Sequence, residues 1–244
     1  QLVDENWVSA AAVLGFFPAN SVGDDIEIYP DESRSHPLST LRHLRQQRRK
    51  RSDQPNDCLS DLIAPAGSGE DFIGAFAVTT GLGLDKHIAR FEEAYDDYSA
   101  IILKALADRL AEAFTERLHE RVRTEFWGYA SEENLGSAAL IAENYSGIRP
   151  APGYPACPDH SEKATLWSLL DVEDSVGITL TDSFAMIPAA SVSGWYFSHP
   201  ESRYFGLGKI GFDQVQDYAE RKCWSLPEAE HWLSANLGYE PAVA

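Results

Sequence analysis

The longest periodic pattern in the sequence lies between about residues 85 and 125, and it predicts a long amphipathic helix. Apolar side chains recur there at steps of three and four, which places them along one face of an α-helix. This apolar stripe consists of Ile88, Phe91, Tyr95, Tyr98, Ile102, Ala105, Leu106, Leu110, Ala113, Phe114, Leu118 and Val122. We interpret the stripe as packing against the core and not as a cofactor-binding surface.

Strand signals lie on both sides of this helix. Residues 25–29 alternate polar and apolar side chains, and residues 71–78 form a nearly continuous apolar run. Further strands are predicted at residues 177–181, 192–197 and 204–210. Strands and helices are interspersed without a repeating βαβα order. The chain is therefore predicted to be α+β, with a largely antiparallel twisted sheet flanked by helices in one domain over residues 1–244.

Two features predict short helices in the second half of the chain. Apolar residues from about 161 to 170 have helical spacing. Near the end, Ser225 is followed three residues later by Glu228, which is a capping box, and Pro227 suits the first turn. We expect two short helices at the C-terminal end, the second beginning at Ser225.

The charge balance and the cysteine count exclude several classes of protein. The 244 residues carry 20 Lys and Arg against 38 Asp and Glu, a net charge of −18. Such a chain is a poor candidate for binding nucleic acid or a membrane surface, because both are anionic. No apolar run approaches the roughly 20 residues of a membrane span. Three scattered cysteines argue against a disulfide framework and favour a cytoplasmic protein.

One stretch contradicts the acidic balance, since residues 42–51 hold six Lys and Arg side chains. They can be the solvated end of a helix followed by a loop, or a docking patch for an acidic partner. The sequence leaves both interpretations open.

A proline-rich segment at residues 147–160, here called the proline loop, is the most unusual local feature. Four prolines fall within nine residues, together with Arg149 and Gly153. Each proline fixes φ and removes a backbone donor, so we expect a stiff loop in which several carbonyls have no sheet partner. A guanidinium on such a loop suits a small polar ligand with a carboxylate. The alternative is a rigid crossover between a helix and the sheet.

Other catalytic and metal-binding patterns are weak. Cys157 and His160 form a Cys-x-x-His pair, but no second pair at zinc-finger spacing follows. The sequence has no nucleophile elbow and no phosphate-binding glycine loop. The residues therefore do not indicate acid–base or nucleophilic catalysis, and we name no catalytic residue and no metal ligand.

The proline loop carries a family resemblance. The pattern Arg149-x-x-x-Gly153-Tyr154 resembles the S-adenosylmethionine-binding signature of the C-terminal reactivation (activation) domain of cobalamin-dependent methionine synthase. Residues 17–29, 104–112, 183–186, 191–200 and 236–239 resemble further segments of that domain in the same order. The similarity covers nearly the whole chain. The family domain extends further at its N-terminus, so we expect that part, and an acidic ligand contact in it, to be missing.

The resemblance implies a part in a methyltransferase, 5-methyltetrahydrofolate–homocysteine S-methyltransferase of methionine biosynthesis. Such a module presents the methyl group of S-adenosylmethionine to reduced cobalamin (vitamin B12) and so restores methylcobalamin. Cobalamin would be bound by a neighbouring domain of the same enzyme, and zinc only in another domain. The electron would come from flavodoxin or a flavodoxin-like reductase, for which residues 42–51 are a candidate docking patch. The alternative is a stand-alone regulatory module that binds S-adenosylmethionine without turnover.

The resemblance also implies which residues contact the ligand: Arg149, Ala151, Gly153, Tyr154, Tyr204, Phe205 and Glu112. Arg149 would pair with the methionine carboxylate, since a guanidinium binds a carboxylate through two hydrogen bonds. Tyrosine is frequent in the family where this chain has Phe205, so any role of Phe205 must be packing or backbone contact. Glu112 matches an acidic position near the ligand, although a surface salt bridge on the predicted helix would explain it equally well.

Overall fold

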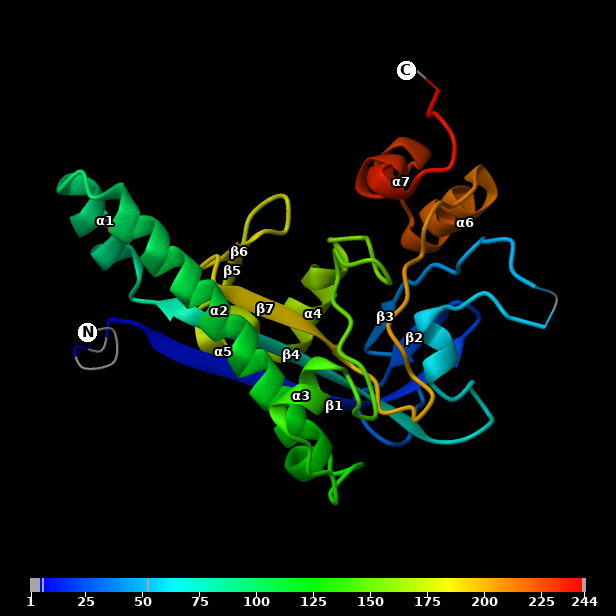
Figure 1. Cartoon of the computed structure of the whole chain (residues 1–244). Helices are drawn as coiled ribbons and strands as arrows, with labels where there is room; N and C mark the ends of the chain where they lie inside the picture. The colour runs from blue at the N-terminus through cyan, green and yellow to red at the C-terminus, as the bar shows by residue number, and fades with distance from the viewer. Residues whose placement is uncertain (1–4, 6, 52, 243–244) are drawn as a thin grey trace. The chain divides into compact units, whose positions relative to one another are not determined.

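The computed structural model describes residue 5 and residues 7–51 and 53–242 (Figure 1). The chain divides into two compact units, which are described separately. The first unit comprises residues 1–15, 75–134 and 166–194, and the second comprises residues 16–74, 135–165 and 195–244. Within the described part of the chain, none of the helices combines the length and the apolar character that crossing a bilayer requires.

The main sheet has five strands in the order β3-β2-β1-β4-β7. Their bounds are β1 Ser9–Val22, β2 Asp25–Ile28, β3 Ser39–Leu41, β4 Asp71–Leu82 and β7 Ser191–Tyr196. The pairs β1–β2 and β2–β3 are antiparallel. A second, antiparallel pair consists of β5 (Thr179–Leu180) and β6 (Met186–Ile187). The prediction of an α+β fold with a largely antiparallel sheet flanked by helices is confirmed.

The first unit contains the long helix, in two pieces. Helix α1 spans Asp85–Glu93 and α2 spans Asp97–Arg121, after which a π-helical turn covers Val122–Phe126. The break falls where Tyr95 has a φ of 56°. Asp96 then begins α2, because its carboxylate accepts a hydrogen bond from the Ser99 backbone at 3.0 Å. Helix α5 (Val172–Val176) belongs to the same unit.

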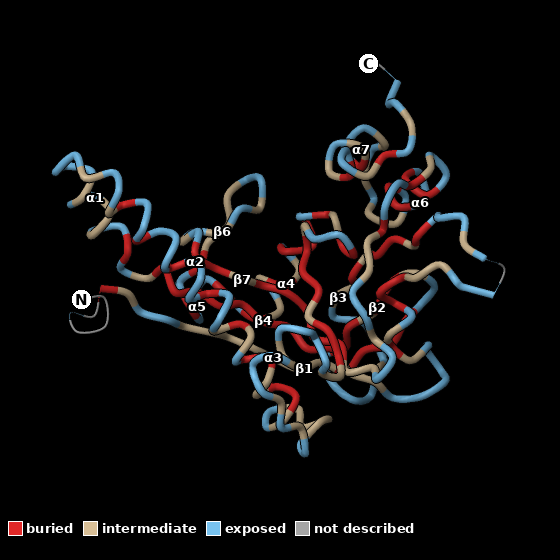
Figure 2. The backbone as a smooth tube through the Cα atoms, viewed as in Figure 1, coloured by how far each residue is buried: buried red, intermediate tan, exposed pale blue. Residues whose placement is uncertain are grey.

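The apolar stripe predicted to pack against the core is wrong for much of α2. Tyr98, Ile102, Leu106 and Leu110 are exposed, and Figure 2 shows much of α2 in the colour of exposed residues. The buried side chains of α2 form a neighbouring stripe: Ala100, Leu103, Ala107, Ala111, Thr115, Leu118 and His119. Small alanines let the helix approach β4 closely, and the Thr80 hydroxyl donates to the Ala107 carbonyl at 2.7 Å. Both stripes have helical spacing, so periodicity alone could not choose between them.

A buried ion pair follows α2 in the first unit. The side chain of Arg123 is fully buried, and its Nη2 lies 2.6 Å from Oε1 of Glu133. A buried charge needs such a partner, because transfer from water into the interior is otherwise unfavourable.

The second unit has its own hydrophobic core around helices α6 (Phe212–Lys222) and α7 (Leu226–Trp232). Its fully buried side chains include Leu207, Val215, Tyr218 and Leu233. The shorter elements are α3 (Ser137–Ile141) and two 3-10 helices, Leu59–Leu62 and Ser234–Asn236. The capping prediction at Ser225 is confirmed, because its side chain accepts a hydrogen bond from the Glu228 backbone at 3.4 Å.

One predicted strand is wrong. Residues 204–210 form no strand, and the only bridge in the segment joins Ile210 to Leu237. Gly208, with a φ of 76°, interrupts the extended backbone. The segment is held by single contacts instead, including a 2.7 Å hydrogen bond from the Gln46 amide to the Gly206 carbonyl.

The predicted helix at about 161–170 is confirmed as α4 (Glu162–Leu170), which begins in the second unit and continues into the first. The proline loop therefore runs directly into a helix start.

Candidate functional site

The proline loop begins as an extension of the sheet. Ile148 and Phe197 exchange two backbone hydrogen bonds of 3.0 Å, and the Trp195 N–H donates to the Pro150 carbonyl at 2.9 Å. The loop then turns on itself, with the Tyr154 N–H donating to the Ala151 carbonyl at 3.1 Å. The start of the loop is thus anchored by regular backbone bonding.

Three carbonyls further along the loop accept hydrogen bonds from turns or a neighbouring segment and not from a strand of the sheet. The Cys157 carbonyl accepts from the Gly153 N–H at 2.7 Å, and the Pro155 carbonyl accepts from the Leu207 N–H at 2.8 Å. The Tyr154 carbonyl accepts from the Cys157 N–H at 2.9 Å. Prolines remove donors only at their own positions, so the rest of the loop could supply a hydrogen-bonded turn.

Gly153 lies where the structure leaves no room for a side chain. Its φ is 94°, a conformation that favours glycine. A Cβ built there would lie 2.5 Å from Nδ1 and 2.7 Å from Nε2 of His160, closer than carbon atoms approach such groups. The imidazole of His160 therefore lies directly against the Gly153 backbone and supports the turn of the signature.

Arg149 and Tyr204 meet at the start of the loop. The Tyr204 hydroxyl accepts a hydrogen bond from the Arg149 backbone N–H at 3.1 Å. The Arg149 guanidinium donates to the Tyr145 hydroxyl at 2.9 Å and lies 5.9 Å from the centre of that ring. The ring of Tyr204 is partly exposed, but burial around its hydroxyl raises the pKa of Tyr204, so the phenol stays protonated and can donate. Residues 55 apart in sequence thus form one polar group.

Tyr145 was missed by the sequence reasoning. It precedes the signature by four residues and belongs to no motif, so no sequence signal singles it out. Its contact with Arg149 depends on the path of the chain between α3 and the loop.

Tyr154 and Ala151 differ in their exposure to solvent. The Tyr154 ring is 57% exposed at the tip of the loop, where a ligand or another domain could contact it. Ala151 is buried, so it can offer a ligand mainly its backbone.

Phe205 lies apart from the Arg149 group. It lines a hollow of about 580 Å³ together with Arg45, Asp61, His199 and Arg203, among others. The neighbouring Tyr204 contacts Arg149, while Phe205 contributes to the hollow. A packing role is the one that this position allows.

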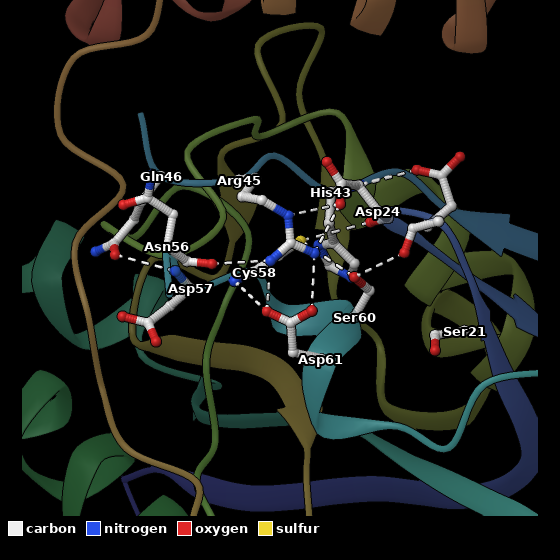
Figure 3. Close-up of polar contacts among 12 residues, drawn as sticks. Ser21, Asp24, His43, Arg45, Gln46, Asn56, Asp57, Cys58, Ser60 and Asp61 are labelled. Carbon is white, nitrogen blue, oxygen red and sulfur yellow. Dashed lines mark hydrogen bonds and ion pairs between the residues drawn. The ribbon is translucent and has the colours of Figure 1, made fainter. Parts of the chain in front are cut away.

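One wall of that hollow includes Arg45, which belongs to the basic stretch at residues 42–51. Figure 3 shows the Arg45 guanidinium between Asp61 and Asp24, with distances of 2.6 Å to Asp61 and 2.7 Å to Asp24. Arg42 pairs with Asp25 at 2.6 Å, and Lys50 pairs with Asp57 at 2.8 Å.

Arg51 lies 3.8 Å from Asp53 and is exposed, while Arg48 and Arg49 are also exposed. Much of the basic stretch therefore neutralises acidic residues of its own unit. The charge available for a docking patch is smaller than the sequence suggested, and it is concentrated on Arg48, Arg49 and Arg51.

Cys157 and His160 have surroundings that do not favour a reactive thiolate. Cys157 is buried, and burial raises the pKa of its thiol well above the ordinary value, so the thiolate is disfavoured. Nδ1 of His160 lies 2.8 Å from Nζ of Lys163. Among the described residues, no group of three or more His, Cys, Asp or Glu side chains could hold a metal ion.

Glu112 belongs to the first unit, whereas the other six predicted ligand contacts belong to the second. It lies on α2 and is exposed to solvent. Its role at the ligand stays a prediction.

Comparison with known proteins gives two strong similarities. The protein family described as "Vitamin B12 dependent methionine synthase, activation domain" matches residues 1–223. A crystal structure of the MetH reactivation domain bound to AdoHcy is similar over 98% of this chain and 74% of that chain. The two sequences are 59% identical over the match, and the TM-score is 0.95.

Proposed function

Because this chain belongs to the family of vitamin B12-dependent methionine synthase activation domains, we propose that it binds S-adenosylmethionine at the proline loop. The observation that carries the proposal is the polar group at the start of the loop. There the Arg149 guanidinium donates to the Tyr145 hydroxyl and the Tyr204 hydroxyl accepts from the Arg149 backbone, four residues before the turn at Gly153. The similar solved domain binds AdoHcy, which differs from S-adenosylmethionine only by the transferred methyl group.

The residues suit the parts of this ligand in different ways. Arg149 would leave the neutral Tyr145 hydroxyl for the methionine carboxylate, because charged hydrogen bonds are stronger than neutral ones. Backbone groups at Ala151 would contact the adenosyl part, while Gly153, which packs against His160, would shape the pocket. Tyr154 would close over the ligand from the exposed tip of the loop.

Phe205 and Glu112 would act through packing and charge. Phe205 would act by packing behind Tyr204, since its side chain lines the neighbouring hollow. Glu112 would supply a negative charge toward the sulfonium or ammonium group.

The family membership also supports a role in a larger reaction. We propose that the chain acts as part of a cobalamin-dependent methyltransferase and docks on its cobalamin-binding domain. The bound cobalamin would supply the cobalt that receives the methyl group in reductive methylation. The role of this chain would be to hold the sulfonium methyl group in line with its acceptor and to exclude water. Such a transfer requires no general base.

Flavodoxin, or a flavodoxin-like reductase, is the proposed electron donor. Flavodoxins are acidic, so the exposed Arg48, Arg49 and Arg51 are the remaining candidates for contact within residues 42–51.

Calorimetric titration with S-adenosylmethionine tests the binding proposal. The Arg149→Ala variant should lose about 2–3 kcal/mol of binding free energy, because the charged hydrogen bonds to the carboxylate are lost. Arg203→Ala is the matched control, since Arg203 is an exposed guanidinium of the same unit that pairs with Asp57. Equal affinity of Arg149→Ala and the native chain would overturn the assignment of Arg149, and no binding by the native chain would overturn the proposed function.

A further inference from the structure

The far end of the proline loop is held by buried polar side chains. Asp159 is 1% exposed, and its carboxylate accepts hydrogen bonds from the Ser161 N–H and the Ser161 hydroxyl, both at 2.8 Å. The Tyr218 hydroxyl, from α6, donates to the same carboxylate at 2.7 Å. This end of the loop is therefore fixed by a residue that lies 59 positions away in the sequence.

Lys222, the last residue of α6, joins the loop end to the start of α4. Its Nζ lies 2.5 Å from Oε1 of Glu162 and 3.1 Å from Oδ2 of Asp159. The same ammonium group donates to the Ser161 hydroxyl at 3.0 Å and lies 4.5 Å from the centre of the Trp224 ring.

Glu162 is 2% exposed and also accepts a 3.3 Å hydrogen bond from the Arg42 backbone N–H. Asp159, Glu162, Tyr218 and Lys222 are here called the buried charge cluster. In it, Lys222 is the one ammonium group that contacts both carboxylates. Burial raises the pKa of Glu162 to about 7 although Lys222 lies beside it, so without Lys222 this buried carboxylate would lose the ammonium group that offsets its charge.

The cluster is connected to the signature of the loop through one side chain. His160 lies between Asp159 and Ser161, the two residues that the cluster fixes. Its ring occupies the space beside Gly153 that a Cβ would need. A shift of the backbone at 159–161 would move this ring and remove the support of the Gly153 turn, which is closed by the 2.7 Å hydrogen bond to Cys157.

We propose that Lys222 is a positioning residue for the methyl-donor loop. By bridging Asp159 and Glu162 it holds His160 against Gly153, and it thereby keeps the loop in the shape that accepts the ligand. The inference rests on the proposed function in that the ligand is taken to bind this loop. The loop-holding part stands on the cluster alone and is measurable without any ligand.

Amide hydrogen exchange and ligand titration at pH 8, where Glu162 is ionised, test the proposal together. In Lys222→Met, the Gly153 N–H should exchange at least 10-fold faster than in the native chain, while the α7 amides stay unchanged. Affinity for S-adenosylhomocysteine should fall at least 10-fold. Lys209→Met is the control, because Lys209 is an exposed lysine of the same unit whose ammonium group donates to the Ala235 carbonyl.

A compensated variant separates the bridge from simple charge burial. Lys222→Met/Glu162→Gln removes one cation and one anion, so the net charge of the cluster is unchanged while the bridge is lost. Fast Gly153 exchange and weak binding in this folded variant would support the proposal. Native exchange and affinity in it, or native Gly153 exchange in Lys222→Met, would overturn it. Fast Gly153 exchange with unchanged affinity would overturn the link between loop shape and ligand, and absence of ligand binding by the native chain would overturn only the proposed function.

Discussion

Replacement of Gly153 by alanine tests the geometry of the proline loop most directly. At a φ of 94°, an alanine would be strained by about 1–2 kcal/mol. Its Cβ would also lie 2.5 Å from Nδ1 of His160, so the imidazole or the loop would have to move. Overpacking of this kind costs about 1–3 kcal/mol. The free energy of unfolding should therefore fall by roughly 2–5 kcal/mol.

Urea unfolding followed by circular dichroism measures this loss. Gly69→Ala is the matched control, because Gly69 lacks a positive φ and nothing lies within 4 Å of the position of its Cβ. That variant should unfold within about 0.5 kcal/mol of the native chain.

The double variant Gly153→Ala/His160→Ala separates backbone strain from the clash. Removal of the imidazole leaves only the strain, so the double variant should be about 1–3 kcal/mol more stable than the sum of the single losses predicts. Additive losses, or a Gly153→Ala chain as stable as Gly69→Ala, would refute the contact between Gly153 and His160.

Two further predictions concern buried charge. Burial, and then the nearby Arg221 and Lys222, lowers the pKa of His43 to about 3. As pH falls below about 6.5, His43 is protonated in the unfolded chain but stays neutral in the folded chain. The free energy of unfolding therefore falls by up to about 1.4 kcal/mol per pH unit. In His43→Leu, the loss of stability between pH 7 and pH 5 should be smaller by roughly 2 kcal/mol in urea titrations, and an unchanged difference would contradict the assignment. In the other unit, Glu133→Ala removes the carboxylate paired with the fully buried Arg123 and should lower the free energy of unfolding by about 3 kcal/mol. The control is Glu132→Ala, which replaces an exposed neighbouring carboxylate and should change the free energy of unfolding little. Equal losses in the two variants would show that the ion pair does not stabilise the fold.

Local structure that is set by residues close together in the sequence could be predicted from the sequence alone. The cap at Ser225 follows from local hydrogen bonding and backbone preference, and the structure has it. The resemblance on the proline loop led to the family for the same reason, because its signature is a short continuous motif. The α+β class followed from the order of helical and strand patterns along the chain.

The side of a helix that packs was decided only by the tertiary structure. Helix α2 carries two stripes with helical spacing, and the buried one contains Ala100 and Ala107 instead of the larger Ile102 and Leu106. Close approach to β4 selects the smaller side chains, and that approach is a property of packing rather than of periodicity. The prediction of a strand at residues 204–210 was wrong for a similar reason. A strand requires a hydrogen-bonded neighbour along its length, and the sequence of the segment does not show whether one is present.

The surroundings of the proline loop were likewise beyond the sequence. Lys222 meets Asp159 and Glu162 across about 60 positions, and Tyr204 meets Arg149 across 55. No local pattern encodes such pairs, because the path of the intervening chain brings them together. The sequence thus identified the loop that is proposed to bind the methyl donor, and the tertiary structure identified the side chains that hold its shape.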